Sequence, residues 1–272
     1  AARVGVLAPP SAHLHSIAAV LAVSMAGAVY VPLDHTAPPR RLAMAIDDAG
    51  VSLLLVVTTH DVAAHLPPSH ADLPLLLLEA PSDFQCPDGM PPLLPTPSAL
   101  ATVLHTSGST GTPKGIMHSH SSVAAAVAGA SAAMFGDVPQ GSLLGGGVPR
   151  SRWLGTTPPA FDIALVELWG SLVWGVELCV TEHVDIVDWW FDAYADIIAS
   201  HAIDMVHAVP IVLDGLASRL ETYGWRSRAS HGVTVVSCGD VLTPALARRL
   251  HALFGSDHVW NGYGPSETNY AT

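Results

Sequence analysis

Positive charge is scarce in this chain of 272 residues, where 11 Lys and Arg stand against 23 Asp and Glu. The net charge of −12 excludes a general electrostatic affinity for nucleic acid or for an anionic membrane surface. Any anionic ligand must therefore be held by a local group of residues. Only 12% of the residues are charged and half are apolar, a composition that excludes a disordered chain and supplies a substantial core.

Cysteine is also scarce. Cys86, Cys179 and Cys238 are odd in number and far apart, and they lack both the spacing of a zinc site and the density of a disulfide framework. We expect a reduced, cytoplasmic protein.

The sequence has no apolar run long enough to cross a membrane. The run from Ile17 to Leu33 holds about 17 residues, where a membrane span needs roughly 20, and Ser24 and Gly27 interrupt it. We interpret it as a buried helix that leads into a strand. No Met begins the chain and no basic segment precedes this run, which argues against a signal peptide, so we expect the chain to begin within a domain.

Helical and strand-like segments alternate along the chain, which predicts a layered α/β fold with largely parallel sheets. Ligand sites then belong at the carboxyl ends of the strands. We expect two α/β subdomains, residues 1–157 and 158–272. Helices are predicted at 16–26, 40–49, 119–134, 164–174, 188–200, 211–220 and 244–253, and strands at 29–31, 51–57, 73–78, 99–104, 177–180, 205–209 and 233–236.

A glycine- and hydroxyl-rich segment, Thr106–Gly115, follows an apolar strand-like run. Glycines let the backbone approach an anion, hydroxyls and backbone N–H groups donate to phosphate oxygens, and Lys114 adds a compact positive charge. A flexible linker is a poor alternative, because the segment stands between a predicted buried strand and a predicted helix. The P-loop motif of NTPases requires Gly before and Ser or Thr after its Lys, whereas Pro113 and Gly115 flank Lys114 here.

The ten residues Thr-Ser-Gly-Ser-Thr-Gly-Thr-Pro-Lys-Gly resemble the phosphate loop of the adenylate-forming superfamily, which includes acyl-CoA ligases, luciferases and the adenylation domains of nonribosomal peptide synthetases. The resemblance implies the N-terminal large domain of that fold and ATP binding. The residues that it assigns to the nucleotide phosphates are Thr106, Ser107, Gly108, Ser109, Thr110, Gly111, Thr112 and Lys114.

The segment Asn261–Glu267 resembles a second element of the same superfamily, Asn-x-Tyr-Gly-Pro-Thr-Glu. By that resemblance Asn261 contacts the adenine amino group, Tyr263 stacks on the base next to Gly262, and Glu267 helps to hold Mg²⁺. Ser266 replaces the usual Thr and keeps its hydroxyl. Taken alone, the segment is only a turn.

Phe161-Asp162-Ile163-Ala164 resembles the Phe-Asp-x-Ser element of peptide-synthetase adenylation domains, although Ala replaces the Ser. The resemblance implies that Asp162 pairs with the α-ammonium group of an amino acid, while helix capping is an equal interpretation. The implied residues around the substrate are Asp162, Ile163, Val166, His207, Val236, Cys238, Gly262, Tyr270 and Ala271. Ordinary core packing is an equal interpretation for Val166, His207 and Val236. The set suits a medium-sized side chain, with His207 or Tyr270 offering one polar contact.

Two further segments carry the resemblance to peptide-synthetase domains. Met25–Asp34 resembles Ala-Gly-x-Ala-Tyr-Val-Pro-Ile-Asp, and Cys238–Thr243 stands imperfectly in place of Gly-Gly-Glu-x-Leu. Together the matches extend from about residue 21 to the end of the chain.

The resemblance therefore implies an AMP-forming ligase that activates an amino acid as aminoacyl-AMP with ATP and Mg²⁺, for transfer to the phosphopantetheine thiol of a carrier protein. Lys114, Ser266 and Glu267 would carry the chemistry. The superfamily's ribose-binding Asp and small C-terminal domain would follow Thr272, so we expect the chain alone to be a poor catalyst. Two alternatives stay open: a fragment of an acyl-CoA or aryl-acid ligase, and a non-catalytic remnant that binds nucleotide.

Overall fold

A computed structural model describes residues 1–9, 13–57, 66–78, 93–107, 113–135, 151–180, 187–225, 233–255 and 258–268. Contacts divide the chain into two compact units, which are considered separately below. The first comprises Ala1–Ala125 and Pro159–Asp162, and the second comprises Ala126–Pro158 and Ile163–Thr272. The expected subdomains 1–157 and 158–272 stay a prediction.

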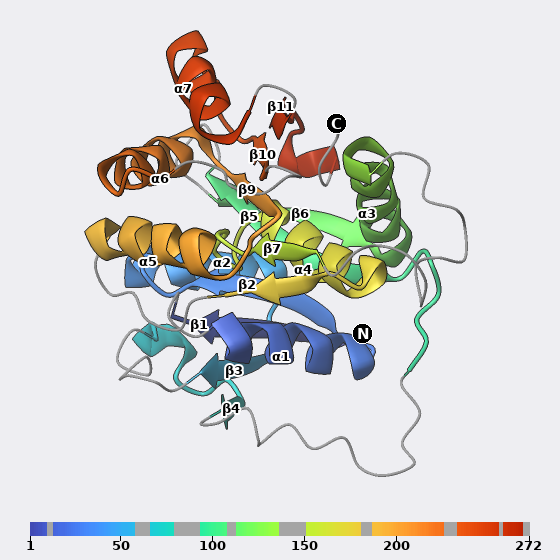
Figure 1. Ribbon diagram of the computed structural model, residues 1–272. Helices are drawn as coiled ribbons and strands as arrows, with labels where there is room; N and C mark the ends of the chain where they lie inside the picture. The colour runs from blue at the N-terminus through green and yellow to red at the C-terminus, as the bar shows by residue number, and fades with distance from the viewer. Residues whose placement is uncertain are drawn as a thin grey trace. The chain divides into compact units, whose positions relative to one another are not determined.

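The first unit contains a six-stranded sheet in the order β4-β3-β1-β2-β5-β6 (Figure 1). Its first five strands pair in parallel, and β6 runs antiparallel to β5. The strands are β1 Arg3–Ala8, β2 Val29–Asp34, β3 Leu53–Val57, β4 Leu75–Leu78, β5 Leu100–Ser107 and β6 Pro113–Ser119.

Two helices cover strands of this sheet. Helix α1 (His13–Met25) contacts β1 and β2, as Figure 1 shows, and α2 (Pro39–Ala49) contacts β2 and β6. Gly50 ends α2 in the left-handed conformation with φ 60°, which glycine adopts without steric cost. The expected helix leading into a strand is confirmed by α1 and β2. Among the described residues, no helix is long and apolar enough to span a bilayer.

The second unit contains a five-stranded sheet in the order β11-β10-β9-β7-β8, in which every pairing is parallel. Helix α3 (His120–Phe135) precedes this sheet in the chain, and the side chain of Ser119 accepts a hydrogen bond from the Ser122 N–H at its start. The strands are β7 Arg152–Leu154, β8 Glu177–Cys179, β9 Met205–Ala208, β10 Thr234–Ser237 and β11 Val259–Asn261; the helices are α4 Asp162–Trp174, α5 Val187–Ser200, α6 Pro210–Thr222 and α7 Pro244–Phe254.

The predicted α/β class is confirmed, and each predicted helix and strand has a counterpart within a few residues. Four strands were not predicted: β1, β6, β7 and β11. Strand β6 also departs from the expected parallel arrangement, because it pairs antiparallel with β5 and begins within the glycine-rich segment. Its sequence contains Pro113 and Gly115, which are poor strand formers, so the pairing depends on β5 and not on local preference.

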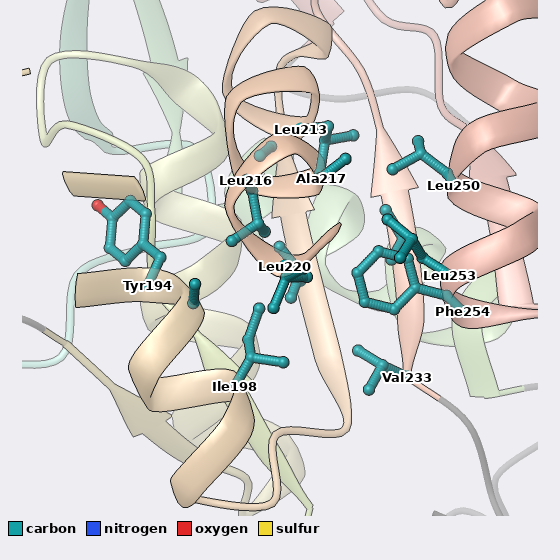
Figure 2. Packing of buried hydrophobic residues seen from close by; sticks show 14 of the residues in the cluster. Tyr194, Ile198, Leu213, Leu216, Ala217, Leu220, Val233, Leu250, Leu253 and Phe254 are labelled. Carbon is teal, nitrogen blue, oxygen red and sulfur yellow. The ribbon is translucent and has the colours of Figure 1, made fainter. Parts of the chain in front are cut away.

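The largest core of the second unit lies where α5, α6 and α7 meet the sheet (Figure 2). Leu213, Leu216 and Leu220 of α6 are fully buried between residues of α5 and α7. At the rim of this core, the Arg249 guanidinium of α7 lies 2.6 Å from both Asp214 Oδ1 and Glu221 Oε2 of α6. Buried apolar side chains hold these helices together, and ion pairs at the edge of the core link α6 to α7.

We predict that Leu220→Ala lowers the free energy of unfolding by about 2–5 kcal/mol, because it leaves a cavity among side chains that cannot fully collapse into it. Chemical denaturation monitored by circular dichroism measures the change. Ile211→Ala on the same helix is the matched control; its side chain is 77% exposed, so the change should stay within about 0.5 kcal/mol. Equal losses for the two variants would contradict this account of the core.

Candidate functional site

The described part of the glycine-rich segment forms the end of β5 and the start of β6 in the first unit. The two strands pair Thr106 with Lys114 and Ser107 with Pro113, so β5 extends three residues beyond its predicted end. Lys114 is exposed at the start of β6, and it is the only lysine of the chain. The remaining predicted phosphate-binding residues, 108–112, lie outside the described residues.

In the second unit, three neighbouring parallel strands bring several predicted site residues to one edge of the sheet. His207 of β9 pairs with Val236 of β10, and Ser237 pairs with Asn261 of β11. The Gly262 N–H then donates to the Ser237 carbonyl at 2.7 Å. The carboxyl ends of the strands therefore hold residues of the predicted substrate pocket beside the predicted adenine-binding segment, as expected for an open parallel sheet.

The segment after β11 presents its side chains outward within this unit. Asn261 and Glu267 are exposed, and the Tyr263 side chain is 78% exposed. A short 3₁₀ turn, η6 (Ser266–Thr268), carries Glu267, and the Thr268 N–H and hydroxyl both donate to the Pro265 carbonyl. The exposed Tyr263 ring can stack on a planar base, and the Glu267 carboxylate on the turn can bind a cation.

Helix α4 begins at Asp162, where a carboxylate is favoured by the positive end of the helix. The next inward residues, Ile163 and Val166, are buried in a cluster that also contains Cys238 and Trp153. Three predicted pocket residues therefore pack together in the second unit. Tyr270 and Ala271 lie outside the described residues.

His207 and Cys238 are in direct contact, with 2.9 Å between His207 Nε2 and Cys238 Sγ. Both side chains are buried, and burial lowers the pKa of His207 to about 3. The imidazole is therefore neutral at physiological pH. The His207 ring stacks on Trp153 with 6.2 Å between ring centroids, and Trp153 in turn stacks on Trp174 at 5.5 Å.

A buried carboxyl group, that of Glu167, lies one turn beyond Asp162 on α4. Its Oε1 accepts from the Thr157 hydroxyl at 2.8 Å and from the Thr156 N–H at 3.5 Å, and its Oε2 accepts from the Thr157 N–H at 3.3 Å. The Thr156 hydroxyl donates to the His207 carbonyl at 2.7 Å. Glu167 thus links α4 through the segment after β7 to strand β9.

Burial raises the pKa of Glu167 to about 8, and its hydrogen bonds to Thr157 and Thr156 oppose part of that rise. The carboxyl group is consequently protonated through most of the neutral range. Glu167 and Trp153 were not predicted as site residues. The available signal for Glu167 was a single acidic residue in the interior of an otherwise apolar helix.

The fold and these strand ends define an α/β protein that places its candidate ligand-binding residues at the carboxyl edge of a parallel sheet. A family model described as "AMP-binding enzyme" matches residues 1–272. The chain belongs to that family, and the predicted superfamily is confirmed.

Curated relatives include surfactin synthase subunit 2 of Bacillus subtilis, 28% identical over 95% of this chain, and chondramide synthase cmdD of Chondromyces crocatus, 32% identical over 93%. The chain spans 7% and 6% of the length of these two relatives.

Two solved structures share the fold. The nonribosomal peptide synthetase FmoA3 matches with a TM-score of 0.78 and 23% identity, over 99% of this chain and 26% of that one. O-succinylbenzoate coenzyme A synthetase of Bacillus subtilis matches with a TM-score of 0.75 and 17% identity, over 99% of this chain and 50% of that one.

We predict that Glu167→Gln flattens the pH dependence of stability between about pH 4.5 and 8. Within that window the unfolded protein loses the Glu167 proton while the folded protein keeps it, so rising pH favours unfolding. The limiting slope is about 1.4 kcal/mol per pH unit for one proton. Thermal unfolding across this pH range measures it.

Glu177→Gln is the matched control, since Glu177 is an exposed residue of β8 that pairs with Arg152. It should keep the slope of the unaltered chain through the neutral range. An unchanged slope in Glu167→Gln would contradict the assignment of a protonated, buried carboxyl group.

Proposed function

We propose that this chain is the nucleotide- and substrate-binding part of an adenylation domain that activates an amino acid as aminoacyl-AMP for nonribosomal peptide synthesis. One observation carries the proposal. Among the described candidate pocket residues, the only charged one is Asp162, and it begins the helix whose next inward residues, Ile163 and Val166, pack in the cluster that contains Cys238. A carboxylate at the edge of a site whose other described residues are neutral suits the ammonium group of an amino acid.

The reaction joins a carboxylate oxygen of the amino acid to the α-phosphorus of ATP, and the bond from that phosphorus to the bridging oxygen of pyrophosphate breaks. Positioning and charge neutralisation lower the barrier of such a step more than acid–base groups do. In this proposal Asp162 orients the amino acid by its ammonium group. Lys114 stabilises negative charge on the phosphates, together with Thr106, Ser107 and the loop residues 108–112.

The segment after β11 supplies the nucleotide contacts in this proposal. Tyr263 stacks on the adenine beside Gly262, Asn261 accepts from its amino group, and the Ser266 hydroxyl donates to the α-phosphate. Their support is the exposure of Asn261, at the end of β11, and of Tyr263, in the segment that leads to η6.

Magnesium is proposed at Glu267. Among the residues that the structure describes, no group of three or more His, Cys, Asp or Glu side chains could hold a metal ion. A single exposed carboxylate nevertheless fits Mg²⁺, which commonly binds one or two carboxylates and completes its shell with phosphate oxygens and water. The ion, when bound, neutralises phosphate charge.

The substrate class that we propose is an amino acid with an uncharged, medium-sized side chain. Ile163, Val166 and Val236 are apolar, and the contact between neutral His207 and Cys238 adds no charge. An ionised side chain would lose its hydration in such surroundings without gaining a partner. The carrier-protein thiol is proposed as the acceptor, because the solved structures that share the fold include a nonribosomal peptide synthetase.

An acyl-CoA or aryl-acid ligase is the second candidate, and the fold shared with O-succinylbenzoate coenzyme A synthetase favours it. Such an enzyme has no ammonium group to bind. Asp162 therefore separates the two candidates.

We predict that Asp162→Ala weakens the binding of the preferred amino acid by roughly ten- to a hundredfold, the usual effect of removing one partner from a charged hydrogen bond. Calorimetry with ATP and Mg²⁺ present measures the affinity. The same acid without its α-amino group is the internal control, because Asp162→Ala should leave its weak binding unchanged. Indifference of amino-acid binding to this substitution would favour the second candidate, and a preference for Asp, Glu, Lys or Arg would contradict the neutral pocket.

A further inference from the structure

A carboxylate on helix α2 contacts the β5–β6 hairpin of the first unit near the end that carries Lys114. The Gly115 N–H donates to Asp48 Oδ2 at 2.9 Å, joining two residues 67 positions apart. Gly115 directly follows Lys114, so this bond holds the backbone beside the only lysine of the chain. The contact between α2 and β6 supports the same junction along a longer stretch.

The Asp48 carboxylate approaches residue 115 more closely than a Cβ atom there would allow. A Cβ atom there would lie 2.6 Å from Asp48 Oδ2, a distance that real Cβ atoms essentially never show, and 3.0 Å from Val103 Cγ1. Any larger residue would push the carboxylate away from the backbone. The glycine in the sequence Pro-Lys-Gly therefore has a local physical reason, namely the close approach of Asp48.

The same carboxylate also reaches the opposite strand. His105, which pairs with Gly115 across the hairpin, has its Nε2 3.4 Å from Asp48 Oδ2. Burial lowers the pKa of His105, and the charge of Asp48 opposes that shift. Asp48 thus contacts both strands of the hairpin at the His105–Gly115 pair, next to the pair of Thr106 and Lys114.

We propose that Asp48 is a positioning residue for ATP, acting through the Gly115 amide to orient Lys114 and the adjoining backbone toward the phosphates. The inference rests on the proposed function. Lys114 is exposed and carries a long, flexible side chain, so its useful direction depends on how firmly the backbone at its base is held. Asp48 makes no phosphate contact itself, since two anions would repel.

Binding of ATP with Mg²⁺ by calorimetry tests the proposal on the 272-residue chain. Asp48→Ala removes the acceptor of the Gly115 N–H and should weaken ATP binding about tenfold. Asp48→Asn keeps an oxygen acceptor and should stay within about threefold of the unaltered chain. If Asp48 acted only through its negative charge, both variants would instead bind ATP more tightly, which would overturn the proposal.

Asp47→Ala is the matched control, because Asp47 stands on the same helix, carries the same charge and contacts His70 instead of the hairpin. It should bind ATP within about twofold of the unaltered chain. A second measurement is the acylation of Lys114, the single lysine, with and without ATP. ATP should protect Lys114 in the unaltered chain and in Asp47→Ala, but much less in Asp48→Ala. The affinity for the amino acid should not change in any of these variants. A general loss of structure would lower that affinity as well, so this measurement distinguishes a local effect from unfolding.

Unchanged ATP affinity and unchanged Lys114 protection in a folded Asp48→Ala chain would overturn the inference and leave the proposed function standing. Absence of ATP binding by the unaltered chain would overturn both. Amide hydrogen exchange supplies a test that needs no variant: the Gly115 amide should exchange slowly in the unaltered chain, and fast exchange would overturn the inference by removing the bond on which it depends.

Discussion

Strand β10 is the element on which the candidate site of the second unit depends, because its backbone pairs with β9 on one side and with β11 on the other. These two registers determine which residues reach the carboxyl edge of the sheet. They place Val236 beside His207, and they bring Asn261 and Gly262 to the end of the same strand. A slip of one residue in either pairing would turn the side chains of the shifted strand to the opposite face.

Two buried ionisable residues near this edge of the sheet are uncharged. Deep burial keeps His207 neutral and Glu167 protonated, so two residues that are often ionised add no charge beside the candidate pocket. Glu167 then acts through hydrogen bonds to the segment that follows β7. Asp162 is the only charged residue among the described candidate pocket residues, and for this reason we propose that it binds the ammonium group of an amino acid.

Local signals made much of the fold and part of the site predictable. Apolar periodicity located the helices within a few residues, and the glycine pattern of residues 106–115 indicated the family that the comparisons confirm. The features that were missed depend on partners in other elements. Strand β6 exists only through its pairing with β5, Glu167 bonds to residues ten and eleven positions away, and the contact of Asp48 with Gly115 spans 67 positions. Periodicity within one element does not reveal these interactions, because each of them joins two different elements.

The central claim is that Asp162 binds the ammonium group of an amino acid whose carboxylate meets the nucleotide. A crystal structure of the chain with a non-hydrolysable aminoacyl-adenylate analogue tests it most directly. The account predicts the ammonium nitrogen about 3 Å from the Asp162 carboxylate, with the adenine stacked on Tyr263. An ammonium group that faces solvent or pairs with a different carboxylate would contradict it.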